Sequence, residues 1–205
     1  MPRGMARTKL ATLLGLVLAV SACGGDASGP ADTGAEPLDP LDGDDTALEL
    51  GKGDGARRTL PPFDAMWSAY PSGEAEEVKR LIGGSVNADW ITNTCTIRLS
   101  RALNYAGFTV PGAVPGLSTV RGGDGKRYAY RVAEMRRYLR AVLGPPTVVG
   151  TGADRAKFAG KKGLIMFDVR IWSDATGHFD LWDGSGPAHA EYFDQATTVQ
   201  LWVAR

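Results

Sequence analysis

Reactive side chains are scarce in this 205-residue chain, which has two cysteines and two histidines. Basic and acidic residues number 23 each, so the formal net charge is zero. A chain without excess positive charge has no field to hold a nucleic-acid backbone, and no nucleic-acid partner is predicted. Paired cysteine ligands, the HExxH pattern, dinucleotide fingerprints and phosphate loops are also absent, so neither a metal site nor a cofactor is predicted.

The charges are distributed unevenly along the chain. Residues 1–22 carry a net charge of +3, residues 24–56 carry −8, and residues 57–205 carry +5. No apolar run reaches the roughly 20 residues that a membrane-spanning helix requires. These three charge regimes predict three parts with different roles.

The first part, residues 1–22, has the order of a secretory signal: basic residues, the apolar run Leu10–Val20, and then small residues. Its end, Val20 to Cys23, resembles a bacterial lipobox. That resemblance implies that the Cys23 thiol receives a diacylglyceryl group and that the exported protein stays on a membrane as a lipoprotein. The alternative is an ordinary signal peptide cleaved near Ala22, with Cys23 incidental.

The second and third parts differ in apolar content. Residues 23–58, which include the anchor cysteine, are rich in Gly, Pro, Asp and Ala and cannot bury enough apolar surface to fold, so they are predicted to form a disordered acidic linker. Residues 59–205 contain all five tryptophans and every tyrosine and phenylalanine, which places the core there.

Periodicity within residues 59–205 predicts helices first and strands afterwards, which indicates an α+β domain. Glycines and prolines delimit these elements. Helices are expected at residues 63–70, from a Ser72 cap to 82, at 93–104 with Arg98 or Arg101 facing outward, and at 132–143, and strands are expected at 163–169, 178–182 and 197–203.

The start of the third expected helix carries Cys95. Unsatisfied N–H groups and the helix dipole stabilise an anion at that position, which favours a reactive thiolate. If Cys23 is acylated, Cys95 also has no disulfide partner in an oxidising compartment. The alternative interpretation is a buried cysteine that acts as a small apolar residue.

His178 opens one of the expected strands, a rigid position from which an imidazole can face the helix that carries Cys95. A thiolate held by an imidazole is the pair that nucleophilic acyl transfer requires. The backbone N–H of Cys95 is expected to help stabilise the oxyanion, and a third polar group is expected to fix the tautomer of the imidazole.

Several collinear motifs then resemble one family, that of type VI secretion amidase effector 4. They are WSAYP, VKRLIGG, NTCTIRLSRALN, AYRVAEM, KKGLIMFDV and WSDATGHFDLWDG, and they extend over nearly all of residues 60–205. The resemblance implies a papain-like, NlpC-type fold in which N-terminal helices, with the nucleophile at a helix N-terminus, pack on an antiparallel sheet.

The same resemblance implies a function. It indicates a cysteine-dependent peptidoglycan amidase, a DL-endopeptidase that cuts the stem peptide between D-glutamate and meso-diaminopimelate. Such an enzyme acts as an antibacterial toxin against a neighbouring cell unless a cognate immunity protein blocks its site.

Carried over residue by residue, the resemblance makes Cys95 the nucleophile and His178 the base. The family's third member is an aspartate, often bracketed by a cysteine pair, in a segment that here reads SGPAHAEYF without either. Ungapped counting places His189 at that position, and His189 is the preferred third member. Asp180 is the competing candidate, because it lies two residues from His178 and so on the same face of the strand.

The lipoprotein-like signal departs from the family, whose effectors are usually injected without one. Remodelling of the producer's own wall, a toxin exchanged between cells and attack on foreign wall fragments all remain open. A different class of function is also open, that of an anchored lipoprotein that binds wall peptides or a partner protein without catalysis.

Overall fold

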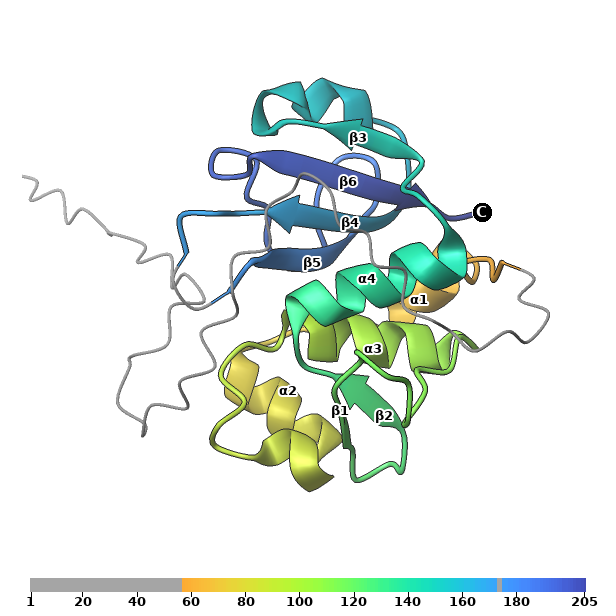
Figure 1. Ribbon diagram of the computed structural model, residues 1–205, viewed down its shortest axis with the longest axis vertical. Helices are drawn as coiled ribbons and strands as arrows, with labels where there is room; N and C mark the ends of the chain where they lie inside the picture. The colour runs from red at the N-terminus through yellow and green to blue at the C-terminus, as the bar shows by residue number, and fades with distance from the viewer. Residues whose placement is uncertain (1–56, 173–174) are drawn as a thin grey trace, which may run out of the picture.

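The computed structural model describes residues 57–172 and 175–205. The predicted signal peptide of residues 1–22, the anchor Cys23 and nearly all of the predicted linker lie outside the described residues. Within the described part, helices come first and the main sheet follows, as the sequence predicts (Figure 1). None of the helices described has the length and apolar character needed to cross a membrane.

The helical half follows the sequence pattern closely. Its α-helices are α1 (Phe63–Ala69), α2 (Ala75–Ile82), α3 (Cys95–Tyr105) and α4 (Val132–Leu143), with the short 3₁₀ helix η1 (Gly84–Asn87) after α2. The glycine-based ends that the sequence predicts for α2 and α4 are confirmed, because Gly83 and Gly144 take positive φ angles of 67° and 86° at their C-termini.

Two details of the helices differ from the expectation. The N-cap of α2 is Glu74 rather than Ser72, because the chain turns at Gly73, where φ is 90°, before the helix begins. Glu74 forms a capping box with Glu77. Arg98, expected on the outer face of α3 if Arg101 is not, is only 1% exposed.

The main sheet is antiparallel, with the strand order β3-β6-β4-β5. Its strands are β3 (Val148–Gly150), β4 (Gly163–Asp168), β5 (Gly177–Trp182) and β6 (Thr198–Val203). The sequence predicts the last three but not β3. It also does not predict the 3₁₀ helix η2 (Gly152–Phe158) or the separate hairpin of β1 (Thr119–Arg121) and β2 (Arg127–Ala129). These elements are too short to show a periodic pattern.

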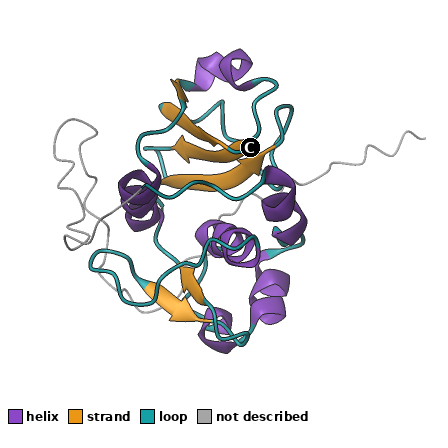
Figure 2. Ribbon diagram, turned by 90° about the vertical axis from the view of Figure 1, so that its right-hand side faces the viewer, coloured by secondary structure: helices purple, strands orange, loops and turns teal. Residues whose placement is uncertain are grey.

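The sheet is covered on both faces, which explains why β4 is buried along its whole length. One face, with Met166 and Phe179, belongs to the core that includes α3 and α4. The other, with Phe167 and Trp182, belongs to a second cluster built on Phe158. Figures 1 and 2 show the four α-helices on one side of the sheet, with edge strand β5 nearest to them, whereas η2 lies at the opposite edge beside β3. Strand β5 also packs against α3, and this contact brings two parts of the site together.

A matched pair of leucine substitutions tests this core. Leu99 on α3 is 0% exposed and Leu81 on α2 is 61% exposed. Leu99→Ala should lower the free energy of unfolding by about 2–5 kcal/mol, because it leaves a cavity. Leu81→Ala should change it by no more than about 0.5 kcal/mol. Urea denaturation measures both, and equal losses would contradict the placement of α3 at the centre of the core.

Candidate active site

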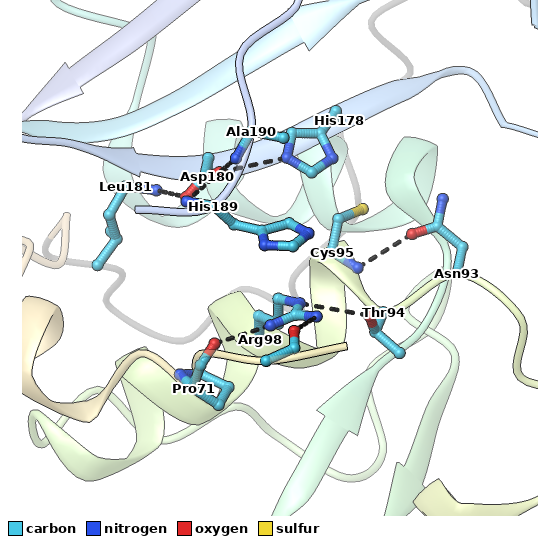
Figure 3. Close-up of polar contacts among 11 residues, drawn as sticks. Pro71, Asn93, Thr94, Cys95, Arg98, His178, Asp180, Leu181, His189 and Ala190 are labelled. Atoms are coloured by element: carbon cyan, nitrogen blue, oxygen red, sulfur yellow. Dashed lines mark hydrogen bonds and ion pairs between the residues drawn. The ribbon is translucent and has the colours of Figure 1, made fainter. Parts of the chain in front are cut away.

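Cys95 is the first residue of α3, and His178 is the second residue of β5. Both are 3% exposed. Figure 3 shows the Cys95 sulfur next to the His178 ring. The two groups interact strongly enough to affect the protonation of the imidazole. The structure therefore brings together the two residues that the sequence pairs as nucleophile and base.

Asp180 is the carboxylate that contacts His178. It lies two residues further along β5 and is fully buried, and its Oδ2 is 3.4 Å from the Nε2 of His178. Backbone N–H groups hold the carboxylate in place: Leu181 donates to Oδ1 at 2.7 Å, and His189 and Ala190 donate to Oδ2 at 3.1 and 2.7 Å. This network orients the imidazole and leaves its Nδ1 for the sulfur.

The surroundings of His178 favour its protonated form. Burial alone lowers the pKa of the imidazole, because it disfavours the charged state. The hydrogen bond with Asp180 and the interactions with Cys95 outweigh burial and raise the pKa to about 9. An imidazolium at neutral pH is the partner that stabilises a thiolate.

Aromatic side chains cover the imidazole. The Tyr192 ring meets the His178 ring edge to face with centroids 4.9 Å apart, and Trp172 packs on Tyr192 in the same way at 4.7 Å. The indole N–H of Trp172 donates to the Gln195 side chain at 3.0 Å, which fixes the outer ring. This stack covers one side of the His178 ring, which is 3% exposed.

The sequence ranks His189 above Asp180 as the third member, whereas the geometry favours Asp180. His189 takes part through its backbone N–H, which donates to Asp180, and its exposed imidazole lies between Cys95 and Arg98 (Figure 3). Desolvation and the Arg98 guanidinium lower the pKa of His189. The sequence prefers His189 because ungapped counting from His178 reaches that position. Such counting does not tell whether the residue contacts its partner through the backbone or through the side chain.

Three further residues shape the site and have no polar role in the sequence prediction. Arg98 donates to Thr94 Oγ1 and to the carbonyls of Pro71 and Gly73, which ties the segment between α1 and α2 to α3. Asn93 accepts the Cys95 N–H through its Oδ1 at 3.0 Å, so the N–H that is predicted to bind an oxyanion already has a partner in the structure. In the sequence, the only indication that Asn93 and Arg98 belong to the site is that they lie in the NTC and TIRL segments, next to Cys95.

Tyr70 is the third of these residues. Its hydroxyl is buried beside the Asp180 carboxylate. Desolvation and the nearby Asp180 carboxylate raise the pKa of Tyr70 well above its ordinary value, so the phenol stays neutral. Across the described ranges, no group of three or more His, Cys, Asp or Glu residues is suited to hold a metal ion.

The pKa of His178 distinguishes the two candidate partners. Asp180→Asn should lower this pKa from about 9, because it removes a carboxylate that stabilises the imidazolium. His189→Ala should not lower it, since that change removes no negative charge. NMR titration of the imidazole resonances measures both variants. A fall in the His178 pKa with His189→Ala and none with Asp180→Asn would reverse the assignment.

Comparisons with known proteins match this chain to one family. The sequence model of the family described as type VI secretion system (T6SS), amidase effector protein 4 matches residues 91–202, more than half of the chain. No curated protein sequence matches the chain.

Solved structures of effectors from two bacteria are similar along nearly their whole length. The crystal structure of the type VI effector Tae4 from Enterobacter cloacae is 34% identical, with 73% of this chain and 100% of that chain covered and a TM-score of 0.68. The effector–immunity complex Tae4–Tai4 from Salmonella Typhimurium matches at 31% identity, 71% and 99% coverage and a TM-score of 0.66. The α+β, papain-like fold expected from the motifs is thus confirmed, and the chain belongs to the type VI secretion system amidase effector 4 family.

Proposed function

We propose that this chain is a cysteine-dependent peptidoglycan amidase that hydrolyses the stem peptide between D-glutamate and meso-diaminopimelate. Family membership supports amide hydrolysis. The observation that carries the proposal is the buried arrangement in which His178 interacts with Cys95 on one side and Asp180 on the other. A protein that only binds wall peptides needs a cleft but no such arrangement.

In the first half of the reaction, the Cys95 thiolate attacks the carbonyl carbon of the D-glutamyl group. The π electrons of the carbonyl move to its oxygen and form a tetrahedral intermediate. As the carbonyl reforms, the C–N bond breaks and the His178 imidazolium gives its proton to the leaving amine of diaminopimelate. The products of this step are a thioester on Cys95 and a free amine.

In the second half, water attacks the thioester and neutral His178 takes its proton. The C–S bond then breaks, which releases the acid and returns the thiolate beside an imidazolium. Asp180 keeps the ring oriented and stabilises its charge through both steps, and the backbone N–H groups of His189 and Ala190 keep Asp180 in position.

Removal of the nucleophile tests the mechanism. Cys95→Ala should abolish the release of new amines from purified muropeptides and the labelling of the buried thiol by iodoacetamide, while the fold remains intact. Cys23→Ser is the matched control, because it changes the other cysteine, and it should retain wild-type turnover. Mass spectrometry of the digests identifies the bond that is cut. Wild-type turnover by Cys95→Ala would end the proposal, and muropeptide binding without amine release by the native chain would favour a binding protein.

An immunity protein is the partner that the similar effectors suggest for this chain. The effectors from Enterobacter cloacae and Salmonella Typhimurium were each solved in complex with an immunity protein. A cognate immunity protein that covers the surface over Cys95 is therefore proposed for this chain as well, with delivery to neighbouring cells as the setting in which it is needed.

The proposal also keeps the predicted membrane anchor. Residues 1–22 act as a lipoprotein-type signal peptide, Cys23 carries the lipid, and the acidic segment up to residue 58 tethers the amidase domain of residues 59–205. Two or more acyl chains give stable attachment where a single chain does not.

Detergent-phase partition tests this anchor. The native chain expressed with its signal should partition into the detergent phase, and Cys23→Ser should move to the aqueous phase because it cannot be acylated. Ser21→Ala, which keeps small residues before Cys23, is the matched control and should partition like the native chain. Equal partition of the native chain and Cys23→Ser would contradict lipidation at this position.

A further inference from the structure

The oxyanion of the tetrahedral intermediate needs a hydrogen-bond donor close to Cys95. Such donors contribute strongly to acyl transfer because they face the atom on which negative charge develops. The nearest backbone donor is the N–H of Cys95, and it donates to Asn93 Oδ1 at 3.0 Å. Another group must therefore supply a hydrogen bond to the oxyanion.

The side chain of Asn93 has the required chemistry. A primary amide carries one acceptor oxygen and an NH₂ group with two donors. The Cys95 N–H is only a donor, so the amide oxygen must face it and the NH₂ group must lie on the other side of the amide. Figure 3 shows this amide beside Cys95, with its nitrogen turned away from the Cys95 backbone. Asn93 is half-buried, and its NH₂ group donates to no other residue that the structure describes.

The guanidinium of Arg98 is also close to Cys95, but it is not available as a donor to the oxyanion. Arg98, one turn along α3 from Cys95, directs its guanidinium at Thr94 and at the carbonyls of Pro71 and Gly73. It is 1% exposed and serves the local structure. Near Cys95 in the sequence, the Asn93 amide therefore remains as a side-chain donor. It is not fully buried, and it takes no part in the hydrogen bonds of Arg98.

We propose that the Asn93 NH₂ group donates a hydrogen bond to the oxyanion during attack by Cys95, an inference that rests on the proposed amidase function. The sulfur–carbon bond forms, the carbonyl π pair moves to the oxygen, and that oxygen accepts the Asn93 N–H. No proton leaves Asn93. When the C–N bond breaks, the electron pair returns to the carbonyl and the hydrogen bond weakens.

Asn93 also accepts the Cys95 N–H in a turn just before α3, whose N-cap is Thr94, and a variant separates the two roles. Asp can replace Asn in such a turn, because its carboxylate can accept the Cys95 N–H. It cannot donate to an oxyanion. A role in the turn alone predicts that Asn93→Asp works and that Asn93→Ala is impaired, whereas the donor role predicts a severe defect in Asn93→Asp.

The experiment compares the native full chain with Asn93→Asp and Asn93→Ala, with purified disaccharide tetrapeptides as substrate. Asn93→Asp should lower kcat by about a hundred- to a thousand-fold with KM changed by no more than about threefold. Its unfolding midpoint in urea should match that of the native chain. The rate of iodoacetamide alkylation of Cys95, followed across pH, reports how far the new carboxylate reduces thiolate reactivity.

Two outcomes would overturn the inference. One is kcat for Asn93→Asp within about threefold of the native value. The other is a loss of kcat no larger than the loss of alkylation rate, because the defect would then come from the thiolate. Cys95→Ala is measured in parallel: an inactive Cys95→Ala beside an active Asn93→Asp removes only the role of Asn93, whereas an active Cys95→Ala removes the amidase mechanism itself.

Discussion

The contacts of one buried imidazole are the interactions on which the rest of this site depends. Burial of His178 opposes a positive charge on the ring, but the hydrogen bond with Asp180 and the interactions with Cys95 outweigh burial and raise its pKa. The fold supplies these partners from different elements. Cys95 comes from the start of a helix, and Asp180 comes from the same strand as His178. The packing of α3 against β5 is what brings them together.

Much of this arrangement can be predicted from the sequence because its signals are local. The stripe of Val132, Met135 and Leu139 defines α4, and the apolar run that becomes β4 is long enough to indicate a buried strand. Cys95 and His178 were identifiable because both residue types are rare in the chain and each lies at the start of a predicted element. The family motifs then gave the order and class of the fold.

The remaining features depend on contacts between distant segments, which spacing alone does not reveal. Asp180 could be proposed from the alternation of a strand, but its preference over His189 depends on the loop that returns the backbone of residues 189 and 190 to the carboxylate. Periodicity predicts that Arg98 or Arg101 faces outward and does not choose between them; Arg98 is the buried one, because the carbonyls of residues 71 and 73 accept hydrogen bonds from its guanidinium. The hydrogen bond from the Cys95 N–H to Asn93 Oδ1 depends on the orientation of the Asn93 side chain, which the sequence does not specify.

The register of β5 carries a further consequence. His178 and Asp180 pair with Phe167 and Ile165 of β4, so all four side chains lie on one face of the sheet. A slip of one residue would present Phe179 and Leu181 there instead, and both polar groups would be lost in a single step. Gly177 opposes such a slip. A one-residue shift would bring a residue with a Cβ into its place, and a Cβ there would collide with the Phe167 carbonyl. Gly177, which carries no reactive group, thus helps to fix the register that places both reactive side chains.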